Sequence, residues 1–129
     1  MPVLNAVGIV VSDMERSIRF YRLLGFDVPH TPGEGHVDTF LPNGVRFMLD
    51  TEDEMRSFLP DWHRSTGNQF GLGVECASPP EVDDLYSRVT SAGFLGEKAP
   101  WDAVWGQRCA QLLDPDDVSV GLYASLPSH

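Results

Sequence analysis

Few residues that could bind a metal or exchange protons share the spacing of a known site. His36 and Asp38 would lie on one face of a regular strand, because side chains alternate along a strand. The histidines form no His-x-His or His-x₃-His pair, and Cys76 and Cys109 form no Cys-x-x-Cys motif. An assembled metal site that uses His36 and Asp38 stays open, but the spacing does not specify one.

Aromatic side chains offer a different chemistry, which is the stacking of a flat guest. Trp101 and Trp105 flank a short loop before a strand predicted at 107–113, and Trp62 lies in a long connector where it could act as a lid. Tyr123 adds a phenol on the polar face of the last strand. An indole provides a large, rigid contact surface, so we expect all four side chains to contact a ligand.

Strand alternation places further candidates beside these aromatic residues. Each of several predicted strands has one bulky apolar face, while the other face carries Ala, Gly, Ser, Gln or Met. Small residues leave space above a sheet for a ligand, another strand or a partner chain. The polar candidates for ligand contact are His36, Asp38, Arg46, Asp50 and Gln69, with Met48 as an adaptable apolar wall.

Composition limits the classes of partner. The 129 residues include 9 Lys and Arg against 19 Asp and Glu, which gives a net charge of −10. A protein that neutralises phosphates needs clustered basic residues, so we expect neither nucleic acid nor an anionic membrane as a partner. An aromatic or cationic small molecule suits this charge better. Two cysteines and the lack of a signal peptide or membrane span predict a soluble, cytoplasmic protein with free thiols.

The order of predicted elements repeats. Strands are expected at 5–11, 36–41, 45–50, 70–76, 107–113 and 118–124. Helices are expected from 13 to about 24 and from 79 to about 92, each followed by Gly-Phe. A short strand is expected after each of these glycines, so the pattern βαβββ occurs twice. The two modules span about 3–58 and 67–126, and together they form one domain at 1–129. This is an α+β fold.

Local signals mark the ends of these elements. Ser12 and Glu15 are predicted to form a capping box at the first helix, and Ser78 and Glu81 at the second, where Pro79 occupies the first helical position. Asn-Gly at 43–44 predicts a hairpin turn. Residues 51–68 are expected to be a connector that can include one short helical turn.

The element order, with SDMERSIRFYRLLGF after the first strand and LLDPDDVSVGLY at the end, resembles the vicinal oxygen chelate superfamily of glyoxalases, bleomycin-resistance proteins and dioxygenases. The resemblance covers the whole chain and implies a curved mixed sheet with helices on its outer face. The stretches KAPWDAVWGQR and DTEDEMRSFLPDW look like the antibiotic-binding branch, such as mitomycin-resistance-type proteins.

In the metalloenzymes of that superfamily, a cation is held by His or Glu from four strands. The resemblance places these positions at Ala6, Met48, Gln69 and Gly121. Ala and Gly have no donor atom, and a thioether is a poor ligand for hard or borderline divalent ions. We therefore expect no cofactor and no catalytic residue at the inherited metal position.

The resulting hypothesis is a metal-independent, homodimeric binding protein that sequesters a small molecule such as an antibiotic. A dimer is expected because open sheets leave edges that a partner can cover. The alternative is a lyase, isomerase or dioxygenase of the same fold with a non-standard metal site. A regulatory module that binds another protein is a third possibility.

Overall fold

The computed structural model of the chain describes residues 1–65 and 69–127. Two compact units are present, Met1–Thr66 and Gly67–His129. Each contains a mixed β-sheet and a helix that is buried along one side. None of the helices in the described residues is long and apolar enough to cross a membrane.

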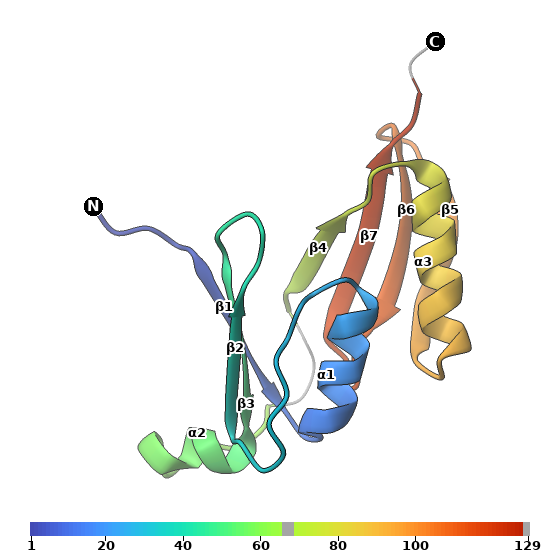
Figure 1. Cartoon of the computed structure of the whole chain (residues 1–129). Helices are drawn as coiled ribbons and strands as arrows, with labels where there is room; N and C mark the ends of the chain where they lie inside the picture. Colours follow the sequence, from blue (N-terminus) through green and yellow to red (C-terminus); the bar gives the residue numbers. More distant parts are fainter. Residues whose placement is uncertain (66–68, 128–129) are drawn as a thin grey trace. The chain divides into compact units, whose positions relative to one another are not determined.

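The first unit is built on a three-stranded sheet. Its elements are β1 (Ala6–Val11), α1 (Met14–Leu23), β2 (His36–Phe40), β3 (Arg46–Thr51) and α2 (Glu52–Phe58). The strand order is β1-β3-β2, with β1 parallel and β2 antiparallel to β3 (Figure 1). The Asn43-Gly44 turn joins β2 to β3 as predicted, and Gly44 adopts a φ of 89° that favours glycine.

Aromatic rings form the core of the first unit. Tyr21 of α1 is fully buried and packs edge-on against Phe20, with centroids 5.0 Å apart. It also contacts Phe26 at 5.8 Å and Phe47 of β3 at 4.8 Å. Side chains alternate along β1 and β3, and the bulky ones face α1, as the sequence predicts. The other face of this sheet carries the polar residues of β2 and β3.

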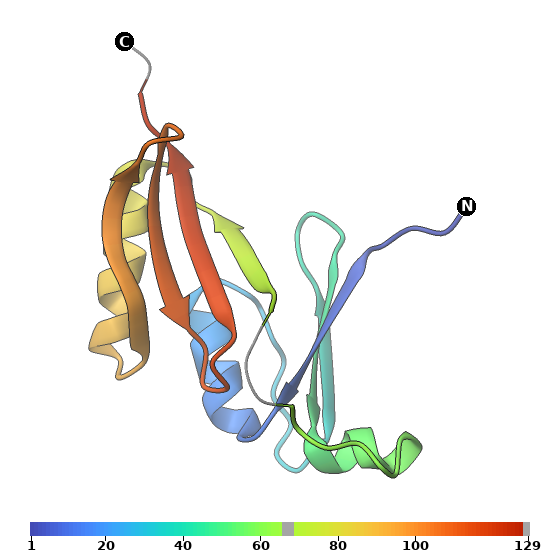
Figure 2. The same cartoon turned by 180° about the vertical axis from the view of Figure 1, so that it is seen from behind.

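The second unit has four strands and one long helix. Its elements are β4 (Gly71–Glu75), α3 (Pro79–Ser91), β5 (Leu95–Ala103), β6 (Gln107–Leu113) and β7 (Ser119–Ser125). The order is β4-β7-β6-β5, and only the β4–β7 pair is parallel. Buried Val82, Leu85 and Val89 line the inner side of α3. Figure 2 shows that α3 covers one face of the sheet and leaves β5, β6 and β7 open on the other.

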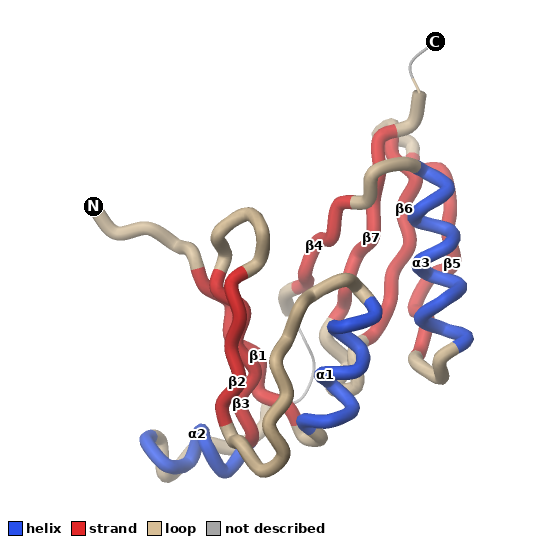
Figure 3. The backbone as a smooth tube through the Cα atoms, viewed as in Figure 1, coloured by secondary structure: helices blue, strands red, loops and turns tan. Residues whose placement is uncertain are grey.

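The expected α+β fold of βαβββ type is confirmed at the level of element order, with one difference. After α1 only β2 and β3 follow, and the segment from Gly25 to Gly35 is a loop without a strand (Figure 3). Hydrogen bonds tie this segment to the end of the helix, because Arg22 Nε donates to the Val28 carbonyl at 2.9 Å. The short apolar run at 26–28 packs as a loop against α1 instead of pairing as a strand.

The connector predicted at 51–68 does contain a short helix, but α2 is longer than the single turn expected and spans seven residues. Thr51 caps this helix by accepting a hydrogen bond from the Glu54 amide at 3.1 Å, and three acidic residues follow in the first turn. Negative charge at a helix N-terminus is stabilising. No residue of α2 is buried, so the apolar periodicity that reveals a helix in a sequence is missing.

The capping prediction was wrong by one residue at α1, and at α3 it was right about the capping residue but not about its hydrogen bonds. Asp13, not Ser12, caps α1, and its carboxylate accepts from the Arg16 amide at 3.1 Å. A charged acceptor makes the stronger hydrogen bond to an N-terminal amide. At α3 Pro79 begins the helix as predicted, but Glu81 accepts from the Ala77 amide at 3.1 Å, and the Ser78 side chain makes no capping bond.

The predicted tryptophan loop was also partly wrong. Strand β5 continues through Trp101 to Ala103, and only residues 104–106 turn toward β6. Gly106 adopts a φ of 89° in this turn. Trp101 therefore lies in a strand opposite Cys109, while Trp105 lies in the turn and is 64% exposed.

A buried carboxylate fixes the turn between β6 and β7. Asp114 is 2% exposed, and its Oδ1 accepts from the amides of Asp116 and Val118, both at 2.8 Å. We expect Asp114→Ala to lower the free energy of unfolding by about 2–4 kcal/mol, because two amide donors lose their acceptor. Asp114→Asn keeps a carbonyl oxygen there and should cost less. Urea unfolding measures both variants, and equal losses would contradict this role of the oxygen.

Candidate ligand-binding recess

The open face of the sheet in the second unit contains a recess with a volume of about 350 Å³. Strands β4, β6 and β7 supply its walls, together with the turn that carries Trp105. Figure 2 views this sheet from the face opposite α3, so its strands are seen in front of the helix. The lining of the recess consists of Gly71, Leu72, Gly73, Trp105, Gln107, Cys109, Gln111, Ser119, Gly121, Leu122 and Tyr123.

Three glycines make this recess possible. In the parallel pair of β4 and β7, Gly71 lies opposite Ser119 and Gly73 opposite Gly121. A Cβ at position 73 would meet the Tyr123 ring at 3.5 Å, and a Cβ at 121 would meet the Gln111 amide at 3.1 Å. The missing side chains therefore leave room above the sheet that the neighbouring Gln and Tyr side chains only partly occupy.

The polar walls of the recess are held by hydrogen bonds. The indole Nε1 of Trp105 donates to Gln107 Oε1 at 3.1 Å. The hydroxyl of Ser119 lies 3.1 Å from Gln111 Oε1 and 3.0 Å from the exposed Glu97 carboxylate. These contacts orient two side-chain amides beside an exposed indole, which is a surface that can stack a flat ring and hydrogen-bond its edge.

The structure brings two of the predicted ligand contacts, Trp105 and Tyr123, into this recess. Trp101 packs edge-on against Trp105 with centroids 6.4 Å apart, and the Lys98 ammonium lies 4.2 Å from the centroid of the Trp101 ring. Trp101 thus supports Trp105 from β5 and does not line the recess. Gln69 is exposed and precedes β4 by two residues.

Sequence reasoning missed Gln107, Gln111 and Ser119 as candidate contacts. Alternation along β6 could have found the two glutamines, because positions 107, 109 and 111 must oppose the buried Ala110 and Leu112. Their chemical role was not visible in the sequence, since it depends on the register between β6 and β7. Gln111 pairs with Gly121 in that register, which brings its amide over an empty position.

The remaining polar candidates form a charge network on the open face of the first unit. His36 of β2 lies opposite Asp50 of β3, and its Nδ1 is 2.5 Å from the Asp50 carboxylate. Its Nε2 is 3.3 Å from Asp38, which also accepts hydrogen bonds from Nε and Nη2 of Arg46. Met48 of β3 pairs with Asp38 of β2 on one side and with Gly8 of β1 on the other.

The two carboxylates favour a charged imidazole. Hydrogen bonding to Asp50 raises the pKa of His36 above its ordinary value of 6.5, burial opposes the shift, and Asp38 adds to it. Hydrogen bonding to Arg46, and then to His36, lowers the pKa of Asp38. With His36 protonated, two negative and two positive groups compensate one another on this face.

This network predicts how stability depends on pH. A raised pKa in the folded state stabilises the fold fully below pH 6.5, and the contribution disappears as pH rises through the folded-state pKa. We expect the difference in melting temperature between the native protein and His36→Gln to be largest below pH 6.5 and to shrink as the pH rises through the raised pKa of His36. His63→Gln is the matched control, and a pH-independent difference for His36→Gln would contradict the network.

Trp62, the predicted lid, has two guanidinium groups close to its ring. The Arg56 and Arg64 carbons are 5.6 Å and 6.0 Å from the centroid of its ring, and both arginines pair with Glu52 of α2. Arg64 also donates to the Val10 carbonyl at 3.3 Å. These contacts fasten the segment after α2 to the helix and to β1.

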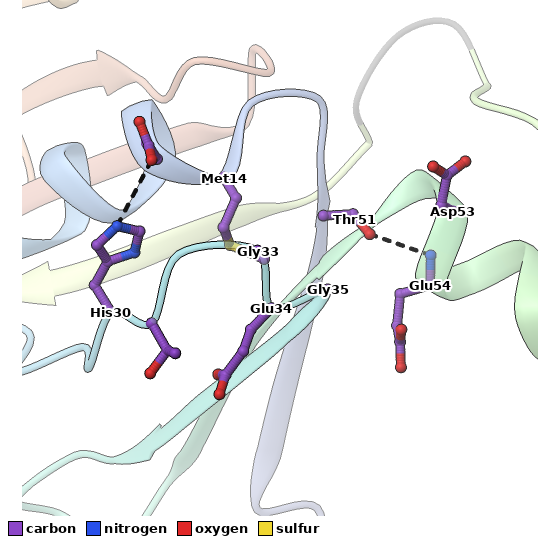
Figure 4. Close-up of a pocket in the computed structure, with 10 residues that line it drawn as sticks. Met14, His30, Gly33, Glu34, Gly35, Thr51, Asp53 and Glu54 are labelled. Carbon is purple, nitrogen blue, oxygen red and sulfur yellow. Dashed lines mark hydrogen bonds and ion pairs between the residues drawn. The ribbon is translucent and has the colours of Figure 1, made fainter.

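A second cavity of about 460 Å³ lies in the first unit between α1, the loop before β2 and the start of α2 (Figure 4). Four carboxylates and one histidine border it, with His30 Nε2 3.7 Å from Glu15. The side chains of Asp53 and Glu54 point in opposite directions in Figure 4, so the carboxylates do not converge on one point. Sequence reasoning did not identify this cavity, which depends on how the loop folds over α2.

The residues at the positions that the resemblance assigns to metal ligands do not fit a divalent metal. Ala6 and Gly121 carry no donor, Met48 offers a thioether and Gln69 an exposed neutral amide. The space beside Gly121 is bordered by the Gln111 side chain. In the described part of the chain, no three His, Cys, Asp or Glu side chains form a group that could hold a metal ion.

Comparison with known proteins supports one family. The sequence model of the Glyoxalase/Bleomycin resistance protein/Dioxygenase superfamily matches residues 3–122. No protein in a curated collection matches the chain. Among solved structures, a glyoxalase/bleomycin resistance protein/dioxygenase from Nocardioides is 26% identical, with a TM-score of 0.76 over 100% of this chain and 87% of the other.

Two further solved structures are similar in fold. A glyoxalase/bleomycin resistance protein/dioxygenase family enzyme from Burkholderia phytofirmans PsJN has a TM-score of 0.81 at 21% identity, covering 95% of this chain and 98% of the other. A glyoxalase-related enzyme from Fulvimarina pelagi has a TM-score of 0.83 at 17% identity, covering 97% and 89%. At these identities the likeness shows the fold alone.

Proposed function

Because the chain belongs to the Glyoxalase/Bleomycin resistance protein/Dioxygenase superfamily, we propose that it binds and sequesters a small molecule with a planar aromatic part, without a metal. The binding site is the recess on the open face of the second unit. The observation that carries this proposal is a glycine-floored hollow bordered by an exposed indole, a phenol and two side-chain amides.

The size and lining of the recess support this function. Ligand sites of about 300–1,000 Å³ suit drug-sized molecules, and this hollow measures about 350 Å³. Trp105 is 64% exposed although it is a large aromatic residue, which leaves an indole surface available for stacking. Gln107, Gln111 and Ser119 supply the few polar groups that orient a guest in such sites.

The chemistry of the lining favours binding over reaction. Its potential nucleophiles are Cys109 and Ser119, and neither has a histidine partner among the hydrogen bonds of the described residues. The positions that the resemblance assigns to metal ligands carry Ala6, Met48, Gln69 and Gly121, whose side chains are poor or absent donors for a divalent ion. Sequestration needs neither a nucleophile nor a Lewis acid. The sequence resemblance to mitomycin-resistance-type proteins suggests the class of guest, which is an antibiotic of the kind that those proteins bind.

A second candidate is an enzyme of the same fold with a non-standard metal site. His36 contacts two carboxylates on the first sheet, but these three side chains are engaged with one another and do not form a group that could hold a metal ion, so the first candidate is favoured. Elemental analysis of the purified protein separates the two candidates. One equivalent of zinc, nickel, manganese or iron per chain would favour the enzyme, and a metal-free protein would favour sequestration.

The binding function is tested directly by a screen of planar antibiotics and other flat aromatics. Quenching of tryptophan fluorescence and a rise in melting temperature are the expected responses, and both should persist in a chelator. Responses that require added divalent metal would contradict metal-independent binding. No response to any planar compound would contradict the proposal as a whole.

Trp105→Ala tests where the guest lies. Removing the indole should weaken binding by more than about 1 kcal/mol, or about fivefold, because stacking area and the anchor of Gln107 are both lost. Isothermal titration calorimetry with the best compound of the screen measures this. Trp62→Phe, in the arginine cluster of the first unit, is the control and should bind normally. An unchanged dissociation constant for Trp105→Ala would remove Trp105 from the site.

A further inference from the structure

The recess is uncharged, although the protein is not. The chain has 9 basic and 19 acidic residues, 28 of 129 in all, yet none of the eleven residues that line the recess carries a formal charge. The nearest carboxylate in the hydrogen-bond network is Glu97, which reaches the recess only through the Ser119 hydroxyl at 3.0 Å. Glu97 is exposed to solvent, so water screens its charge.

The hydrogen-bonding direction of Gln107 follows from its partner. An indole N–H can only donate, so the atom of Gln107 that faces Trp105 Nε1 at 3.1 Å must be the carbonyl oxygen. The amide NH₂ of Gln107 then points away from the indole. Because Gln107 itself lines the recess, this NH₂ group is a donor available to a guest that stacks on Trp105.

Gln111 adds a second neutral amide on the same strand. It lies two residues beyond Cys109 on the same face of β6, and its amide extends over Gly121. Ser119 contacts the amide at 3.1 Å and limits its rotation. Two glutamines therefore face the guest with groups that hydrogen-bond but cannot compensate a charge.

A cationic guest would lose hydration in this recess without meeting an opposite charge. Burial of an unpaired charge costs more free energy than burial of a hydrogen-bonded neutral group. The residues from 67 to 129 include nine acidic and three basic residues, a net charge of −6. This field attracts cations from a distance, but salt screens it and it supplies no contact inside the recess.

From these observations we infer that the recess selects neutral planar molecules with a ring carbonyl, such as quinones, ring ketones or lactams, over cationic aromatics of the same shape. The ring stacks on Trp105, and the carbonyl oxygen accepts from the Gln107 amide. The inference rests on the proposed function. It replaces the sequence-based expectation that the acidity of the protein selects a cationic guest.

Two pairs of probes test the inference, because each pair matches shape and differs in charge. Acridone is compared with 9-aminoacridine, and 4-quinolone with 4-aminoquinoline, at neutral pH, where both amines are protonated. Dissociation constants are measured by calorimetry on the full chain. In at least one pair, the neutral member should bind about tenfold or more tightly than the cation.

Two substitutions assign this selectivity to named side chains. Gln111→Glu places a carboxylate in the recess and should reduce or invert the preference for the neutral probe. Gln107→Leu removes the NH₂ donor and should weaken binding of the neutral probe about tenfold while changing that of the cation little. Unchanged melting temperatures and far-ultraviolet circular dichroism spectra would show that the variants fold. The ratio of the affinities for the neutral and the cationic probe is the quantity compared, because a general loss of stability changes both affinities alike.

The outcomes separate this inference from the proposed function. If the cations bind as tightly as the neutral probes or more so, the inference is overturned, while binding of planar molecules stands. If selectivity is present but neither glutamine variant changes it, the assignment to Gln107 and Gln111 is overturned. If no probe of either pair binds, the inference is overturned, and the proposed function then depends on the wider screen of planar compounds.

Discussion

Gly73→Leu should weaken binding of the guest severely while leaving the protein folded. Gly73 lies in β4 at the floor of the recess, and a Cβ there meets only the Tyr123 ring at 3.5 Å, which is ordinary contact. The longer leucine side chain would occupy the hollow itself. We expect a loss of at least about 2 kcal/mol in binding free energy, or about thirtyfold.

A graded series makes this result specific. Gly73→Ala adds one methyl group that the structure accommodates and should weaken binding much less than Gly73→Leu. Both variants should melt at or above the native temperature, because glycine is unfavourable within a strand. Calorimetry gives the affinities and a thermal melt gives the stability. Native affinity in Gly73→Leu would place the guest outside this recess.

Tyr21→Ala should be the most destabilising single change in the first unit. The ring is completely buried and contacts Phe20, Phe26 and Phe47, whose centroids lie within 5.8 Å. Truncation of a buried aromatic residue costs about 3–5 kcal/mol, because a cavity remains where the ring was. A domain is stable by only about 5–15 kcal/mol, so much of the stability would be lost.

Urea unfolding measures this loss, and Trp62 reports on the first unit when Trp101 and Trp105 are replaced by phenylalanine. Phe58→Ala is the matched control, because Phe58 is an aromatic residue of α2 that is 61% exposed. It should change the free energy of unfolding by less than about 0.5 kcal/mol. Equal losses for the two variants would contradict the aromatic core described here.

The sequence predicted those elements whose local signals and burial agree. Alternating apolar residues specify β1, β3 and β7, since one face of each strand is covered by a helix. Pro79 marks the start of α3. Gly25 and Gly93 follow α1 and α3 with φ angles of 91° and 97°, which side chains rarely adopt. This element order, with the sequence stretches at each end, resembles the superfamily, and the family match over residues 3–122 shows the membership.

Elements without a buried face could not be predicted in this way. Helix α2 buries no residue, so its signals are only the Thr51 cap and the acidic first turn. The run at 26–28 is apolar enough for a strand, but its backbone bonds to the end of α1 instead. Propensity favours an element, and the available hydrogen-bond partners decide whether it forms.

The residue types of the site were visible in the sequence, but their grouping was not. Trp105 and Tyr123 were predicted as ligand contacts from their chemistry, whereas Gln107 and Gln111 became candidates only through the register of β6 with β7. The same holds for His36, which meets Asp50 because β2 pairs with β3 in one register. By itself the sequence determined which strand faces are small or polar and which aromatic residues accompany them. Only the tertiary structure decided which of these residues share one recess, because strand pairing is a contact between residues far apart in the chain.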